Sequence, residues 1–486
     1  MGEMKNGGYS LAIGMVYCFN LMMGAGLLAL PKVFAQEGWI LGLGGVAVLA
    51  FMSYTTVTFI IEAQSVHNAL KRREDGKDGV QMDTVIQNKN TVEENNNNND
   101  NNEKTRDKNH LSGVENNSSV DRYEITMKTE LGELCNVFLN KIGYTVFYIA
   151  FCLYLFGSTS IYAAAVSKSL ASIVCKDHES FHSGNTTRFC TTLPGQLSLM
   201  QTYRISLALF AVLCCPFAFF TLSKTKVLQL STMAFRFFAL TAMIILAVMK
   251  IARKEGPKKP ELAVFSKLPD FIGTSIYAFM CQYCIPALVT PIHNKKHIRV
   301  AIFGAFCLVV LFCTSILMSA SYAFEADEVQ DLYTLSFTHP PALKYILELF
   351  PVITLGTNFP IITIVLRDNI KNLCLRRPEE EYGFFVRRIL FPLIAITPSI
   401  VISCYTYDVG LLVGYTGAYA GGIIQYVIPV FLVYNARRKA REVFGEYRNR
   451  YASQFTGLFW LVLVMVWYIL SLGLVTYSKI KKLQRH

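Results

Sequence analysis

Apolar runs of about twenty residues recur from one end of this chain to the other, and they constrain its fold more than any other feature. A helix of ~20 apolar residues is long enough to cross the ~30 Å hydrocarbon core of a bilayer. Charged residues make up only 16% of the sequence, against roughly 25% in an average soluble domain. The pattern predicts an all-α polytopic membrane protein with about eleven transmembrane helices. We expect the spans at residues 9–31, 37–62, 144–174, 201–222, 232–251, 268–290, 299–323, 342–366, 386–406, 409–434 and 456–478.

One long hydrophilic insert, residues 65–140, separates the second span from the third. Its centre, TVEENNNNNDNNEKTRDKNH, is too poor in apolar residues to offset its chain entropy, so we expect it to be largely disordered. Residues 122–143 regain amphipathic spacing and are expected to lie along the membrane surface. The remaining divisions are an N-terminus (1–8), two spans (9–62), nine spans (144–478) and a C-terminal tail (479–486).

The short loops predict the orientation of the chain. With a cytosolic N-terminus and a cytosolic insert, the basic segments around Lys295 and Arg299, around Arg376 and in ARRKAREVFGEYRNR lie inside, and EADEVQD lies outside. This is a positive-inside pattern, although the basic loop 253–267 and the tail KIKKLQRH disagree with it. Positive loops explain the net charge of +12 better than a nucleic-acid surface does, so no nucleic-acid partner is expected.

The same orientation places the loop between Cys175 and Cys190 outside, together with the sequon at Asn185. Both features suit that side, because glycosylation and disulfide formation take place in oxidising compartments outside the cytosol. We therefore predict a glycan on Asn185 and a disulfide between Cys175 and Cys190.

The first span contains helix breakers, in the stretch NLMMGAGLLALP (20–31). Gly24 and Gly26 loosen the helix and Pro31 removes a backbone donor. In a membrane, unwound backbone survives only where it lines a cavity or is buried in protein. The alternative is close helix packing, because glycine is common in membrane spans.

The sixth span, FIGTSIYAFMCQYCIPALVTP, is also interrupted, by Gly273, Pro286 and Pro291. Spans one and six occupy corresponding places in a fold of two inverted five-helix repeats. Such a pair of discontinuous helices is the best sequence indication of a binding site at mid-membrane. Half-helix N-termini attract a carboxylate, and opened carbonyls hold an ammonium group or a cation. This pair therefore favours a site for an amino acid, which carries both charges.

Several stretches resemble the transmembrane protein 104 family over almost the whole chain. They are GYSLAIGMVYCFNLMMGAGLLALPKVFAQEGW, SIYAAAVSKSL, SIYAFMCQYCIPALVTPI, LGTNFPIITIVLRDN and GYTGAYAGGIIQYVIPVFLVY. More broadly, the Asn-x-x-x-Gly-x-Gly-x-x-x-x-Pro segment followed by Gly38-Trp39 is similar to the amino acid/auxin permease branch of the amino acid–polyamine–organocation transporters.

The resemblance implies an inverted-repeat core of spans one to ten, a peripheral eleventh span and a cytosolic N-terminus. It implies no cofactor beyond a coupling ion, Na+ or H+, and either an endomembrane address such as the lysosome or the plasma membrane. Substrate would contact Met23, Gly24, Ala25 and Gly26 in the first span and Tyr277, Ala278, Phe279 and Gln282 in the sixth. Sodium-using relatives hold the ion between spans one and eight, which makes Thr354, Thr357 and Asn358 candidates.

Other polar residues within spans have both structural and functional interpretations. Asn20, one turn before Gly24, could cap the unwound segment, touch substrate or tie the first span to a neighbour. Glu348, in the eighth span, is a candidate proton carrier, since a carboxylate at membrane depth is a functional hypothesis by default. Glu62 is expected at the solvated cytosolic interface, and Arg236 is expected to snorkel to cytosolic headgroups.

The remaining motifs are weaker. Cys281 and Cys284 form a C-x-x-C without a second pair, so no metal site is expected. GYTGAYAGG could be a hinge in the tenth span. A further set of aromatic residues either lines the cavity or packs between helices: Tyr154, Tyr162, Tyr415, Tyr419 and Tyr426.

The sequence thus favours secondary active transport of amino acids or related small zwitterions by alternating access. The alternative is a transporter-like sensor that binds substrate and signals without significant flux. The expected partners are the small-molecule substrate and membrane lipid, and the sequence does not identify which proteins, if any, bind this chain. An enzyme is not expected, because no catalytic grouping of side chains stands out.

Overall fold

The computed structural model describes residues 9–76, 122–175, 190, 197–219, 226–257, 259–293, 295–375, 382–445 and 449–484. Within these residues ten helices are long and apolar enough to cross a membrane, and a bent pair of shorter helices makes an eleventh span. The all-α polytopic fold with eleven spans is therefore confirmed. Residues 1–8, the insert residues 77–121 and Asn185 lie outside the described residues.

Each expected span corresponds to one helix or to a group of consecutive helices. In chain order they are α1 (Leu11–Met22) with α2 (Ala25–Glu37), α3 (Trp39–Glu74), α6 (Lys141–Cys175), α8 (Leu199–Cys214) with η1 (Cys215–Phe219), α9 (Lys226–Ala252), α10 (Leu268–Ala278) with η3 (Gln282–Cys284) and α11 (Ile285–Val289), α12 (Ile298–Ala323), α13 (Pro341–Cys374), α14 (Phe391–Tyr405), α15 (Val409–Thr416) with α16 (Ile428–Phe444), and α17 (Leu458–Leu483).

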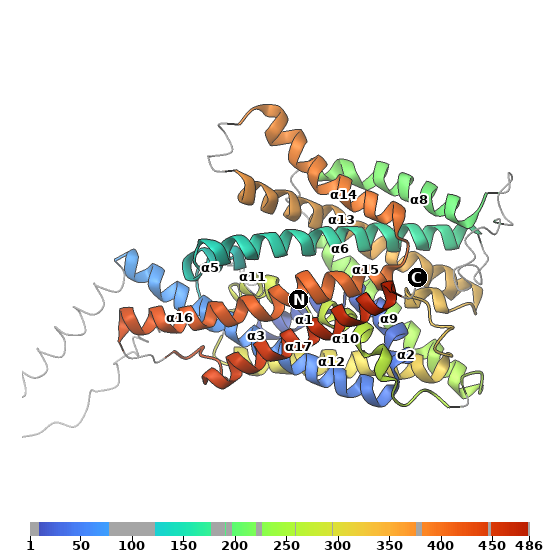
Figure 1. Ribbon diagram of the computed structural model, residues 1–486, viewed down its shortest axis with the longest axis horizontal. Coiled ribbons are helices and arrows are strands. Elements are labelled where there is room, and N and C mark those ends of the chain that lie inside the picture. Colours follow the sequence, from blue (N-terminus) through green and yellow to red (C-terminus); the bar gives the residue numbers. More distant parts are fainter. Residues whose placement is uncertain are drawn as a thin grey trace, which may run out of the picture.

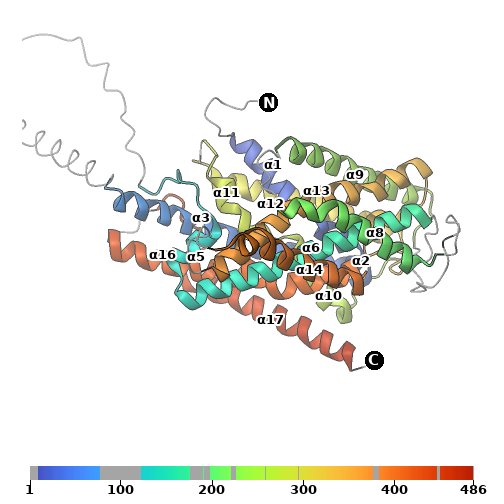
Figure 2. The same ribbon diagram turned by 90° about the horizontal axis from the view of Figure 1, so that it is seen from above.

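The sixth span lies at the centre of the bundle and α17 at its edge. α10 packs against α2, α15 and the first π-helical segment of the tenth span, whereas α6 packs against α13 and α8 (Figure 1). α17 runs along the outside of the bundle (Figure 2). Its last turns are held to the start of α10, because Lys479 Nζ lies 3.0 Å from Asp270 Oδ1 and Lys482 Nζ lies 2.5 Å from Asp270 Oδ2.

Glycine lets α10 and the tenth span approach closely. A Cβ on Gly273 would lie 2.8 Å from the carbonyl oxygen of Gly414, and one on Gly417 would lie 2.2 Å from the carbonyl oxygen of Gly273. The expectation that Gly273 interrupts the sixth span is therefore wrong. α10 continues through this residue, whose hydrogen side chain serves helix packing.

The tenth span changes helix type in the glycine-rich region where a hinge was predicted. Two π-helical segments, η7 (Gly417–Gly421) and η8 (Ile423–Val427), separate α15 from α16. π-Helical turns are rare and occur frequently at functional sites. Here η7 packs directly against α10.

A covalent link and a buried ion pair stabilise the end of the bundle that bears the acidic loop. Cys175, the last residue of α6, is disulfide-bonded to Cys190. The loop between α12 and α13 buries Asp331, which forms an ion pair with Lys168 of α6 and accepts a hydrogen bond of 2.9 Å from the backbone N–H of Val409. Burial raises the pKa of Asp331, but the charges of Lys168 and Lys32 and the two hydrogen bonds together hold it below its ordinary value.

We expect Asp331→Asn to destabilise the protein at neutral pH, because the substitution removes the carboxylate charge that opposes the buried charge of Lys168. A carboxylate with a lowered pKa stabilises the fold above its unfolded pKa and loses that contribution only as the pH falls through the lower folded value. The difference in unfolding temperature between wild type and variant in detergent should therefore persist from neutral pH to about pH 5. If the difference in unfolding temperature disappeared near pH 6, the lowered pKa of Asp331 would be contradicted.

The opposite end of the bundle departs from the sequence expectations. α3 and α16 extend side by side beyond the other spans (Figure 1), and α3 continues to Glu74, past the expected end at residue 62. The stretch 122–143 folds onto these helix ends, and its expected position along the membrane surface stays a prediction. Only α5 (Leu131–Phe138) and the start of α6 are helical there, and α5 packs against α6, α16 and α3.

The expectation that Glu62 is solvated is also wrong. Its carboxylate is fully buried and accepts two hydrogen bonds of 2.8 Å from Nε and Nη2 of Arg437 on α16. The backbone N–H of Ser453 donates a further bond of 2.8 Å to the same carboxylate. Glu62 therefore ties α3 to the tenth span and to the segment that precedes α17.

Candidate functional site

The first span breaks where its two glycines predicted unwound backbone. α1 ends at Met22, α2 begins at Ala25, and their axes differ by 57°. Met23, between them, has a φ of −85° and a ψ of 49°, which lie outside the helical region. The discontinuity predicted for this span is confirmed.

The break leaves hydrogen-bonding groups of α2 without side-chain partners. No side chain caps the first turn of α2 within the described residues, and Gly24 at the N-cap position offers none of its own. The first N–H groups of a helix have no intrahelical acceptor and lie at the positive end of its dipole. The backbone around Ala25 and Gly26 is therefore suited to an anionic group such as a carboxylate.

The two glycines at the break have different surroundings. A Cβ on Gly26 would lie 2.6 Å from the Cα and 2.9 Å from the backbone nitrogen of Ala278, so α2 and α10 meet here backbone to backbone. A Cβ on Gly24 would approach only the carbonyl oxygen of Leu21, at 4.0 Å. Gly26 thus serves helix packing, whereas Gly24 borders open space next to the uncapped turn.

The sixth span unwinds after Ala278, and neighbouring side chains satisfy its freed backbone. Ser53 of α3 donates to the carbonyl of Phe279 at 2.9 Å. Gln282 accepts from the backbone N–H of Cys281 at 2.9 Å and donates to the hydroxyl oxygens of Ser53 and Thr56 at 3.0 Å each. In this structure Gln282 and Phe279 hold the break against α3, and Gln282 is fully buried.

Arg236 reaches the break from the fifth span. One guanidinium nitrogen of this residue, Nη1, donates to the backbone carbonyl of Asn20 at 2.9 Å and to its side-chain oxygen at 3.1 Å. The expectation that Arg236 snorkels to the headgroups is therefore wrong, because the side chain is buried against the end of α1. Asn20 accordingly ties the first span to a neighbour, and a positive charge lies at the carbonyl end of α1.

Tyrosines from the third and sixth spans gather near the break. Tyr277 donates to the hydroxyl of Ser158 at 3.1 Å, and its ring centroid lies 5.6 Å from that of Tyr154. Tyr283 lies 5.7 Å from Tyr154.

The candidate aromatic residues of the tenth span face another neighbour. Tyr419 shares a hydrogen bond of 3.1 Å with Thr476 of α17, and Tyr415 stacks on Tyr419. Tyr426 is fully buried and lies 5.9 Å from Tyr468, also on α17. The three residues therefore pack the tenth span against α17.

The candidate ion ligands lie on α13 and bond within their own helix. The hydroxyls of Thr354 and Thr357 each donate to a backbone carbonyl four residues earlier at 2.7 Å, and Asn358 donates to the carbonyl of Thr354 at 2.8 Å. α13 packs against α6, α9 and α14, whereas α1 packs against α12 and α11. The structure thus does not place α13 closely against α1.

Glu348 lies nearer the N-terminal start of α13 and is fully buried. Ser172 of α6 donates to its Oε1 at 3.1 Å. This carboxylate is therefore part of the contact between the third and eighth spans, at the end of α6 that carries the disulfide.

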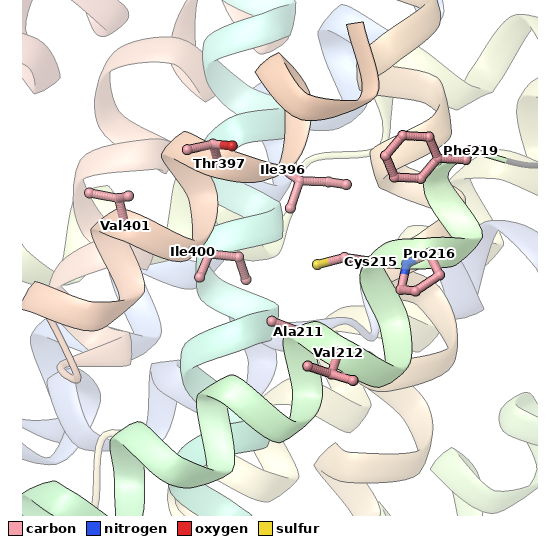
Figure 3. Close-up of a pocket in the computed structure, with 9 residues that line it drawn as sticks. All are labelled: Ala211, Val212, Cys215, Pro216, Phe219, Ile396, Thr397, Ile400 and Val401. Carbon is pink, nitrogen blue, oxygen red and sulfur yellow. The ribbon is translucent and has the colours of Figure 1, made fainter. Parts of the chain in front are cut away.

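A lateral groove of about 730 Å³ lies away from all of these residues. It separates α8 and η1 from α14, and Cys215, Ile396 and Ile400 point toward it (Figure 3). Its lining contains none of the predicted site residues.

Sequence reasoning missed three residues that complete the region of the breaks. The sequence shows Arg236 as a lone cation in an apolar run, but it does not show where the side chain of this residue points. Ser53 and Ser158 carry no signal, since isolated serines are common in membrane spans. Their roles follow from the neighbours that the fold gives them.

The eleven spans and the paired breaks in spans one and six define a polytopic helical membrane protein with discontinuous helices. The family described as transmembrane amino acid transporter proteins matches residues 7–79 and 116–473. The chain is 38% identical to human transmembrane protein 104 over 484 residues, covering 96% of each chain, and 35% identical to the homologue from Drosophila melanogaster over 503 residues, again covering 96% of each. It belongs to the transmembrane protein 104 family, as the sequence resemblance predicted, within the wider amino acid transporter family.

Proposed function

We propose that this protein carries an amino acid or a related small zwitterion across the membrane by alternating access. The observation that carries the proposal is the uncapped first turn of α2 beside the open space at Gly24. Membership of a family of amino acid transporter proteins supports it.

In this proposal the substrate carboxylate binds the backbone N–H groups of Ala25 and Gly26. Its ammonium group lies toward the tyrosine hydroxyls from the third and sixth spans, whose oxygens accept hydrogen bonds. Met23, Gly24 and the backbone of Tyr277 and Ala278 would border the substrate. Asn20, Phe279 and Gln282 would position the two breaks, since their polar groups already have protein partners.

The coupling ion in this proposal is H+ rather than Na+. Arg236 places a permanent positive charge on the carbonyl end of α1, where a sodium ion would otherwise offset the negative end of the helix dipole. Thr354, Thr357 and Asn358 are bonded within α13, which is not a close neighbour of α1. Glu348 is the candidate proton carrier because it is a carboxylate buried between two spans.

Purified protein in proteoliposomes tests this proposal with a panel of labelled amino acids, while sodium and pH are varied independently. We expect saturable uptake of at least one amino acid, equal initial rates in sodium and choline buffers, and faster uptake with an inward proton gradient. A strict sodium requirement would overturn the assigned coupling ion. Absence of flux for every substrate would overturn the transport proposal.

The second candidate function is sensing, and one observation favours it. Met127, near the C-terminal end of the cytosolic insert, is hydrogen-bonded to Asn68 of α3 and to Thr290 directly after α11, so the insert is connected to the discontinuous sixth span. A purified protein that binds an amino acid in calorimetry but gives no flux would support the sensor.

We further propose that the N-terminus and the insert are cytosolic, in an endomembrane or in the plasma membrane. The bundle end with the insert carries the basic residues Arg72, Arg73 and Arg299, and the other carries the acidic loop and the disulfide. A glycan at Asn185 belongs to the same proposal.

A further inference from the structure

We propose that residues 122–130, which we call the strap, act as a regulatory latch between the cytosolic insert and the inner half of the sixth span. Displacing the strap releases α11 and changes access to the binding site from the insert side. The consequence for access rests on the proposed transport function, whereas the latch itself is a structural statement with its own readout.

The strap is held by side chains of α3 instead of by secondary structure of its own. Asn68 Oδ1 accepts hydrogen bonds from the backbone N–H groups of Thr126 at 3.1 Å and Met127 at 2.8 Å. One helical turn further along, Arg72 donates to the carbonyls of Arg122 at 3.1 Å and Glu124 at 2.7 Å. Side chains four residues apart lie on one face of a helix. Gln64, Asn68 and Arg72 therefore form one row of polar side chains on α3, which we call the ladder.

Apolar contacts complete the attachment of the strap. Ile125 is fully buried, and Tyr123 is buried with its ring centroid 5.9 Å from that of Phe444 at the end of α16. The guanidinium carbon of Arg122 lies 5.1 Å from the centroid of the same ring. The strap therefore joins the projecting ends of α3 and α16, directly where the insert re-enters the folded bundle.

The same ladder binds the inner half of the sixth span. Gln64, one turn before Asn68, donates to the carbonyl of Pro286 at 2.9 Å and to the hydroxyl of Thr290 at 3.0 Å. The hydroxyl of Thr290, the residue directly after α11, donates to the carbonyl of Pro286 at 2.9 Å and shares the same hydrogen with the strap carbonyl of Met127 at 3.4 Å. One network thus holds α3, the strap and α11, and α11 follows directly after the break of the sixth span.

These contacts make the strap a detachable element. Apart from the carbonyl of Glu130, which accepts from the first turn of α5, the strap is outside helices and sheets, and segments of this kind open locally at a lower free-energy cost than core helices. Residues 77–121 of the insert connect the end of α3 to the strap. A partner or modification that acts on these residues can therefore displace the strap. Release would remove the contact between the carbonyl of Met127 and the hydroxyl of Thr290, and would leave Gln64 of α3 as the remaining hydrogen-bonded support of α11 in this network.

Hydrogen–deuterium exchange on the full-length protein tests the latch directly. We expect Asn68→Ala to speed exchange about tenfold in the strap, because two backbone N–H groups lose their acceptor, and also to speed exchange in residues 285–292. Thr290→Val, which keeps the side-chain size, should speed exchange in both segments to a lesser degree. Arg438→Ala is the control, since Arg438 lies on α16 near the same bundle end but pairs with the exposed carboxylate of Glu442 instead of the strap.

Faster exchange in the strap without any change in residues 285–292 would overturn the link to α11. Unchanged exchange in both segments for Asn68→Ala would overturn the latch itself. If both segments respond, the two variants should also change the rate of uptake or the affinity for substrate, whereas Arg438→Ala should not. Wild-type rates and affinities in all three variants would overturn the regulatory role. Failure of the transport proposal would instead appear as an absence of flux in the wild-type protein.

Discussion

Gly24→Val is expected to abolish most transport while leaving the fold intact. The added side chain enters open space, since a Cβ at this position approaches only one carbonyl oxygen, at 4.0 Å. In that position it obstructs the uncapped first turn of α2. A lost charge-assisted hydrogen bond costs about 1.5–3 kcal/mol, which corresponds to roughly 10- to 100-fold weaker substrate binding. Uptake into proteoliposomes and thermal unfolding in detergent measure the two effects separately.

Two other glycines serve as comparisons. Gly26→Ala should lower stability by about 1–3 kcal/mol, a typical cost of overpacking, because its Cβ would lie 2.6 Å from the Cα of Ala278. Gly44→Val, at an exposed position of α3 with no atom within 4 Å of an added Cβ, should leave both stability and uptake unchanged. Wild-type uptake by Gly24→Val would exclude the first break as the substrate site.

Glu62→Gln is expected to lower the stability of the protein more than Gly26→Ala does. The change leaves the Arg437 guanidinium buried opposite a neutral amide, and breaking a buried ion pair on one side costs about 3–5 kcal/mol. Thermal unfolding of the purified protein in detergent should show the loss, together with a lower yield of folded protein from membranes.

The neighbouring helix position supplies a matched control for that substitution. Arg438 and Glu442 form an ion pair of the same length, 2.8 Å, but their side chains are 70% and 58% exposed. Glu442→Gln should cost at most about 0.5 kcal/mol, because exposed pairs on one helix contribute little. Equal small shifts for the two variants would show that water screens the Glu62 pair, contrary to its burial.

The spans and the position of the first break could be predicted from sequence because both depend on local chemistry. The length of an apolar run determines whether a helix can cross a bilayer, and Gly24 and Gly26 mark where the helix unwinds. The fold class needed no knowledge of which helix packs against which. The inverted relation between the two halves stays a prediction.

The contacts at the site could not be predicted, because they depend on how each helix is rotated. Arg236 could have pointed to the headgroups or to Asn20, and only the rotation of α9 decides between them. Gly273 and Gly26 serve packing while Gly24 borders open space, yet the three residues are chemically identical. The polar residues of the ladder on α3 recur at a spacing of four, which the sequence shows, but the strap backbone that they bind lies fifty or more residues away along the chain.

The ion pairs of Lys479 and Lys482 with Asp270 couple the position of the peripheral helix α17 to that of the central helix α10. Any rotation of α10 about the tenth span must either drag the end of α17 with it or break two contacts to one carboxylate. A fluorescent label near the end of α17 would therefore report motion at the centre of the bundle without a probe being placed there.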